Sequence, residues 1–127
     1  MKLKFITLSF VFLFTSTFLQ ESKTDLLCGK KWFAKYIEMG ENKMPVPPGE
    51  QNQMWMIFEK DGVHKVNTNN TVKKGTWKFT KNKDSIFFTT EKGLEKKMKL
   101  ETLNKESLVL VLEERGQEGK IYLEKEE

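Results

Sequence analysis

The chain has 127 residues, of which 38% are apolar and 31% are charged, and it carries a net charge of +4. This composition is typical of one globular domain and excludes a disordered or fibrous chain. Cys28 is the only cysteine, which excludes an intramolecular disulfide and leaves a hydrophobic core to hold the fold.

Residues 1–20 have the pattern of a secretory signal peptide. A basic head, MKLK, precedes the apolar run from Phe5 to Phe14 and a short polar tail. This run is about ten residues long, roughly half of what a membrane-spanning helix requires. We therefore expect cleavage near Gln20 or Ser22 and an exported mature chain, periplasmic or secreted, without a transmembrane segment. Cleavage also removes two lysines, so the mature chain is closer to neutral.

The rest of the chain consists of short β-rich runs separated by turn-forming residues, as in antiparallel sandwiches and barrels. Asp61-Gly62 and Asn69-Asn70 favour the positive backbone angles of tight hairpin turns. Short links place consecutive strands side by side, and closing the sheet removes its exposed edges. We predict an all-β fold over residues 26–124, an antiparallel up-and-down meander of about eight strands forming a barrel or half-barrel. The predicted strands are residues 31–38, 54–60, 63–68, 72–80, 85–90, 94–103, 107–113 and 120–124.

The segment 39–53 is the exception to these short links, and it contains all three prolines. Loops longer than about 12 residues are uncommon in compact domains and are usually functional or disordered. Met44 and Val46 give the segment an apolar tip. We therefore expect it to act as a lid, with Met44 and Val46 closing over the domain.

Three of the predicted strands differ in how their apolar residues are distributed. In residues 94–103, Leu94, Met98 and Leu100 share one face at period two, which favours a strand over a helix. The runs MWMIF (54–58) and LVLVL (108–112) are apolar on both faces. Such strands are covered on the outside, lie against another element, or form a dimer surface.

Two glycine and tryptophan stretches point to a family. CGKKWFAK (28–35) and KKGTWKF (73–79), together with IFEKDGVHKV and SIFFTT, resemble the small bacterial lipocalin-like domains of exported proteins over residues 26–124. The resemblance implies a barrel that binds a small apolar molecule in its cup. It also implies that Gly29 and Trp32 lie at a closed barrel end, where an arginine of a late strand, here Arg115, packs on the tryptophan. The family motif has one residue between glycine and tryptophan, whereas this chain has two.

Apolar and aromatic side chains of the middle strands are the candidate lining of such a cup. The expected ligand-binding residues are Trp55, Phe58, Trp77, Phe79, Phe88 and Met98. The alternative is a filled barrel in which these side chains are core. The protein would then be an envelope interaction module that uses an apolar face, such as MWMIF, against a protein partner or a second copy of itself.

The sequence gives no support to a catalytic or metal-dependent function. His64 is the only histidine and has no neighbouring ligand set, so we expect it to face solvent or to be hydrogen-bonded, and we expect no metal and no cofactor. Nucleophile elbows and phosphate-binding loops are missing from the sequence, and we predict that the protein is not an enzyme. Lysines interspersed with glutamates argue against nucleic acid as a partner. Cys28 is expected to be a small buried residue, the alternatives being an intermolecular disulfide or a reactive thiol.

Overall fold

The computed structural model describes residues 22–126 except 48, 51–52 and 115. The predicted signal peptide and Arg115 lie outside the described residues. In the described part of the chain, a short helix, α2 (Lys23–Leu27), precedes nine strands. The strands are β1 (Lys31–Met39), β2 (Asn42–Pro45), β3 (Trp55–Phe58), β4 (Val63–Thr68), β5 (Thr71–Phe79), β6 (Ser85–Thr90), β7 (Glu95–Leu103), β8 (Ser107–Glu114) and β9 (Gln117–Lys125).

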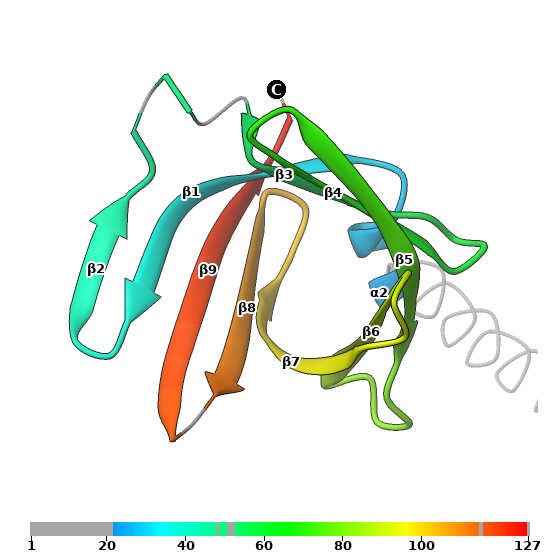
Figure 1. The fold of residues 1–127 in the computed structure, drawn as a ribbon. Helices are drawn as coiled ribbons and strands as arrows, with labels where there is room; N and C mark the ends of the chain where they lie inside the picture. The colour runs from blue at the N-terminus through cyan, green and yellow to red at the C-terminus, as the bar shows by residue number, and fades with distance from the viewer. Residues whose placement is uncertain (1–21, 48, 51–52, 115, 127) are drawn as a thin grey trace, which may run out of the picture.

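Eight of these strands form a closed antiparallel barrel, and β2 is an additional strand at its side (Figure 1). From β3 to β9 each strand pairs with the next, and β1 pairs with both β3 and β9. The β1–β9 seam runs from Trp32 opposite Lys125 to Met39 opposite Gly119. The prediction of an all-β up-and-down meander is confirmed, and the sheet closes completely.

Tight turns join the strands where the sequence indicated them. Asn69 and Asn70 adopt positive φ angles of 51° and 65° between β4 and β5, a conformation that asparagine tolerates better than most residues. Between β3 and β4, Gly62 has a φ of 96°, and the Asp61 carboxylate accepts a hydrogen bond from the Val63 N–H at 3.1 Å. These turns fix which residues of adjacent strands lie opposite each other.

The segment 39–53 is not one long loop, as the sequence suggested. Its first part forms β2, which pairs with the end of β1, and the β1–β2 hairpin projects from the barrel (Figure 1). The Val46 N–H donates a hydrogen bond to the Lys35 carbonyl oxygen at 2.9 Å, and the Val46 side chain is only 3% exposed. Met44 is 55% exposed on β2. Val46 therefore packs as a core residue, and a lid role for Met44 and Val46 stays a prediction.

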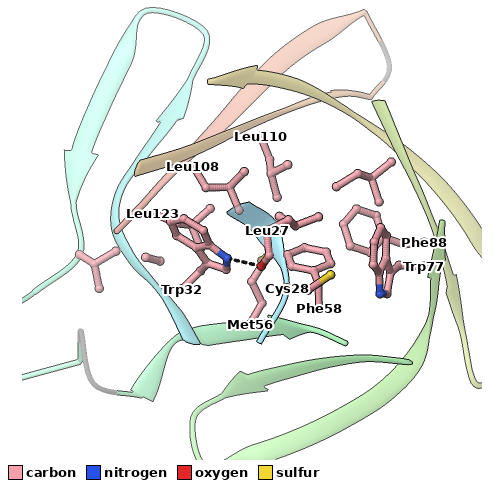
Figure 2. Close-up of a cluster of buried hydrophobic side chains, with 13 residues drawn as sticks. Leu27, Cys28, Trp32, Met56, Phe58, Trp77, Phe88, Leu108, Leu110 and Leu123 are labelled. Carbon is pink, nitrogen blue, oxygen red and sulfur yellow. Dashed lines mark hydrogen bonds between the residues drawn. The ribbon is translucent and has the colours of Figure 1, made fainter. Parts of the chain in front are cut away.

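One end of the barrel is closed by α2 and the residues that follow it (Figure 2). The Trp32 indole N–H donates a hydrogen bond to the Leu27 carbonyl oxygen at 2.9 Å, and both side chains are fully buried. Cys28 is 6% exposed, which confirms the expected burial, and desolvation raises the pKa of its thiol. Gly29 has a φ of 78°, and its N–H donates to the Phe58 carbonyl oxygen at 3.1 Å. This hydrogen bond connects the segment after α2 to the end of β3.

Candidate functional site

The strand register identifies the side chains that face the barrel interior. Directly opposed residues of adjacent strands share a face of the sheet, and side chains alternate between faces along each strand. Opposed residues that are buried together therefore mark the interior. These pairs include Trp32 with Met56, Phe58 with His64, Trp77 with Phe88, and Leu108 with Leu123.

Burial along this interior face falls steeply from one end of the barrel to the other. At the end closed by α2, the interior side chains are fully buried, and we call this group the base: Leu27, Trp32, Phe58, Leu108 and Leu110. Toward the opposite end, the interior positions keep contact with solvent, and we call this second group the mouth: Val66, Lys73, Lys96, Leu112 and Ile121. Within the mouth the two lysines are exposed and the three apolar residues are half-buried. The barrel is thus packed at its base and accessible at its mouth.

Five of the six predicted ligand-binding residues belong to the interior. Phe58, Trp77 and Phe88 are buried, and the Phe58 ring lies 5.6 Å from the Trp77 ring and 5.7 Å from the Phe88 ring. Phe79 and Met98 are half-buried and pack against this cluster, with the Phe79 ring 5.1 Å from that of Trp77. These side chains form the wall of the barrel between β3 and β7.

Trp55 does not belong to this interior group. Along β3, Met56 and Phe58 are buried, whereas Trp55 and Ile57 lie on the opposite face and are half-buried. The Lys31 ammonium lies 4.8 Å from the centre of the Trp55 ring. Trp55 therefore belongs to the outer wall, and its assignment to the cup is corrected.

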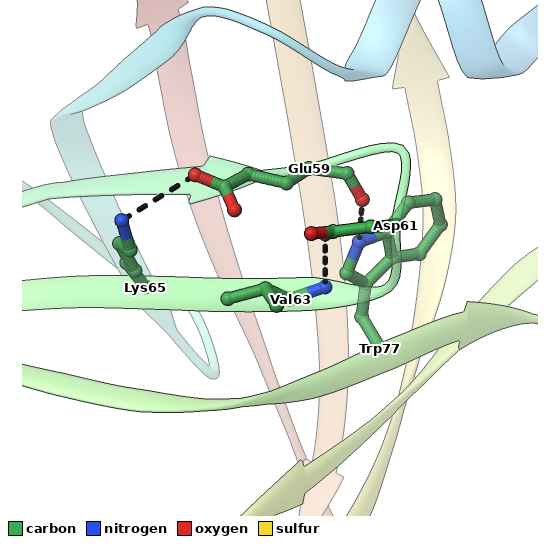
Figure 3. Close-up of polar contacts among 5 residues, drawn as sticks. All are labelled: Glu59, Asp61, Val63, Lys65 and Trp77. Atoms are coloured by element: carbon green, nitrogen blue, oxygen red, sulfur yellow. Dashed lines mark hydrogen bonds and ion pairs between the residues drawn. The ribbon is translucent and has the colours of Figure 1, made fainter.

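The β3–β4 turn holds Trp77 in place (Figure 3). The Trp77 indole N–H donates to the Glu59 carbonyl oxygen at 2.8 Å, and the Trp77 backbone N–H donates to the Gly62 carbonyl oxygen at 2.9 Å. The Glu59 carboxylate in turn lies 3.4 Å from the Lys65 ammonium. Because both N–H groups of Trp77 are satisfied by the turn, its ring can pack edge-on against Phe58 in the interior.

His64 is a buried interior residue, so the part of the expectation that places it in solvent is wrong. Its side chain is 9% exposed, and its ring centre lies 4.9 Å from that of Phe58 and 4.6 Å from that of Phe88. Burial lowers the pKa of the imidazole to about 4, so the ring is neutral near pH 7. Its Nε2 atom is buried without a hydrogen-bond partner in the described part of the chain. The signal that would have found it is the Asp61-Gly62 turn, which brings His64 opposite Phe58.

The described residues contain no group of three side chains that could hold a metal ion. They likewise include no helix with the length and apolar character needed to cross a membrane. What the interior offers is an apolar surface, one neutral imidazole at the boundary between base and mouth, and two lysines at the rim. Such a surface is suited to holding an apolar or amphipathic molecule.

No protein-family model and no curated protein matches the chain. Among solved structures, it is similar to a lipocalin-like protein from Bacteroides uniformis, with 18% sequence identity and a TM-score of 0.58. The similarity covers 80% of this chain and 99% of the other. Together with the closed eight-stranded meander, this likeness shows that the chain has the fold of a small bacterial lipocalin-like domain.

Proposed function

We propose that this chain is an exported, non-enzymatic binding protein that takes a small apolar molecule into the mouth of its barrel. The decrease in burial from base to mouth is the observation that carries the proposal. Val66, Leu112 and Ile121 are apolar, lie on the interior face, and still contact solvent. Covering apolar surface of this kind contributes about 25 cal/mol per Å² removed from water.

The base supports the same function by giving the site a rigid floor. Fully buried side chains from α2 and from several strands pack into one cluster beneath the mouth. A preorganised floor lowers the entropy that binding must overcome, because few side chains have to be ordered when the ligand arrives. The exposed Lys73 and Lys96 at the rim are compatible with an amphipathic as well as a purely apolar molecule.

Titration with N-phenyl-1-naphthylamine, whose fluorescence rises in apolar surroundings, tests this proposal on protein purified after expression of the full chain. We expect saturable binding that long-chain alcohols displace. Val66→Trp should block it, because the added volume would fill the mouth. Val72→Trp is the matched control, since Val72 is 50% exposed on the outer face of β5, and it should bind as the wild type does. If both variants bind the probe equally well, the probe binds outside the mouth, and the proposal is contradicted.

A second function, a protein–protein interaction module, is favoured by the β1–β2 hairpin. β2 is the end strand of the sheet, so one of its edges has no neighbouring strand in the parts of the chain that the structure describes. Met39 and Met44 on this hairpin are 49% and 55% exposed. A partner strand could add to such an edge. Native mass spectrometry of protein purified from its own host distinguishes the two functions, since it detects either a bound small molecule or a bound polypeptide.

A further inference from the structure

The unpaired Nε2 atom of His64 suggests what kind of molecule the mouth accepts, an inference that rests on the proposed binding function. We propose that His64 Nε2 is the polar anchor of the site and that the ligand is an apolar molecule carrying one uncharged hydrogen-bonding group, a hydroxyl or a carbonyl. The group would reach the floor of the mouth and bond Nε2, while the apolar remainder covers the half-buried residues above it.

The first argument is the state of Nε2 itself. The atom is buried and has no hydrogen-bond partner among the described residues. Buried polar side-chain atoms in native proteins almost always have a partner, because an unsatisfied one loses its bonds to water without replacement. A ligand group that donates or accepts a hydrogen bond would supply the partner that Nε2 lacks among the described residues.

The second argument is the position of the ring. On the interior face of β4, the next residue toward the open end is Val66, which is half-buried. On β5, the residue opposite His64 is Gly75, so no side chain stands across from the imidazole there. One interior position further out, Lys73 is exposed. His64 therefore lies where the packed base meets the accessible mouth, at the depth that the end of an entering ligand would reach.

The third argument is the chemistry of the surroundings. The rings of Phe58 and Phe88 pack against the imidazole. A water molecule in a protein interior typically needs two to four polar partners, and these aromatic neighbours do not supply them. A carboxylate at this depth would lose its hydration next to a neutral ring, with Lys73 one interior position further out. A hydroxyl or carbonyl group has the smallest desolvation cost of the groups that can bond Nε2.

The test compares 1-decanol with 1-chlorodecane, which have similar chains and differ in the terminal group. We expect the Kd of the alcohol to be about fivefold lower than that of the chloride, which is the difference expected for one net hydrogen bond. Because His64 is the only histidine, the ring nitrogens in a long-range ¹H–¹⁵N NMR spectrum belong to it alone. Decanol should shift the Nε2 signal, and chlorodecane should leave it in place.

The variant His64→Phe keeps a ring of similar size in the aromatic cluster and removes the nitrogen. It should still bind chlorodecane and should lose the preference for the alcohol. Asn67→Ala is the control, because Asn67 is a buried polar residue of the same strand that bonds the Gln53 carbonyl oxygen at 2.9 Å on the other face. This variant should keep the preference.

Each remaining outcome overturns the inference in a distinguishable way. Equal affinity for the two compounds, or an unchanged His64 signal with decanol, refutes the anchor while leaving the proposed binding function intact. Tighter binding of decanoate than of decanol points instead to an anionic head group held by Lys73 and Lys96. If neither compound binds the wild-type protein, the proposed function fails together with the inference.

Discussion

The ionisation of His64 couples the stability of the fold to pH. Burial lowers the pKa of the folded-state imidazole to about 4, below the roughly 6.5 of an exposed histidine. The unfolded chain therefore binds a proton more readily than the folded chain between these two values. The stabilisation is complete above pH 6.5 and is lost as the pH falls toward 4.

We predict that lowering the pH from 7 to 5 costs about 2 kcal/mol of unfolding free energy through this residue alone. Urea denaturation at the two pH values measures this difference in the free energy of unfolding. His64→Phe serves as the reference, since it removes the titrating group and should reduce the difference between the two conditions by that amount. A variant with the same pH dependence as the wild type would show that the histidine is not buried as described.

Gly75 is required by a close approach between β5 and β6. A Cβ atom at this position would collide with the Thr89 carbonyl oxygen, which belongs to the backbone and cannot rotate away. We predict that Gly75→Ala lowers the free energy of unfolding by about 2 kcal/mol or more. Gly49→Ala is the control, because nothing lies within 4 Å of its added Cβ atom, and it should leave the melting temperature almost unchanged. Similar melting temperatures for the two variants would refute this account.

At the residue scale, the sequence predicted which side chains are apolar but not which face each one takes. Residues 54–58 are apolar on both sides, so their alternation could not decide between Trp55 and Met56. The register with β1 decides it by placing Met56 opposite the buried Trp32. His64 was misjudged for the same reason, since its face follows from the partner strand. Residues 94–103 were different, because lysines and glutamates alternate there with apolar residues and reveal the face directly.

At the element scale, the connection between β2 and β3 is a structural part of the barrel. We predict that Val46→Ala destabilises the protein by about 2 kcal/mol, because it removes two methyl groups from a core side chain that is 3% exposed. Met44→Ala, two residues away and 55% exposed, should change stability by less than about 0.5 kcal/mol. Thermal unfolding of the two variants measures this difference. If Met44→Ala lowered the stability more than Val46→Ala, the β1–β2 hairpin and not Val46 would hold the connection between β2 and β3 in place.

The eight barrel strands could be predicted because turn residues separate short runs that are rich in β-forming residues. β2 was missed because it ends at Pro45 and precedes Pro47, residues that normally argue against a strand. Proline is tolerated at the edge of a sheet, which is where β2 lies. α2 was missed because a helix of five residues has almost no periodic signal. Both elements depend on tertiary contacts with β1 and the base.

At the scale of the whole molecule, we propose that the predicted signal peptide is cut before Ser22. The Ser22 hydroxyl accepts a hydrogen bond from the Asp25 N–H at 3.2 Å and caps α2, whose Leu27 belongs to the base. A cut after Ser22 would remove this cap, at a cost of about 1 kcal/mol. Intact mass spectrometry of the exported protein should therefore show a chain that begins at or before Ser22. An uncleaved chain retained in the cytoplasm would contradict the proposal.

The seam between β1 and β9 also bears on how the barrel folds. From β3 to β9, each pairing joins two strands that a short turn links. The seam instead joins the first barrel strand to the last. Closing so long a segment of chain has a high entropic cost before its contacts form, so we expect the seam to form late. Until then, the edges of β1 and β9 are open to neighbouring chains. The rate of refolding, more than the stability reached at its end, should therefore decide how much of the protein escapes aggregation.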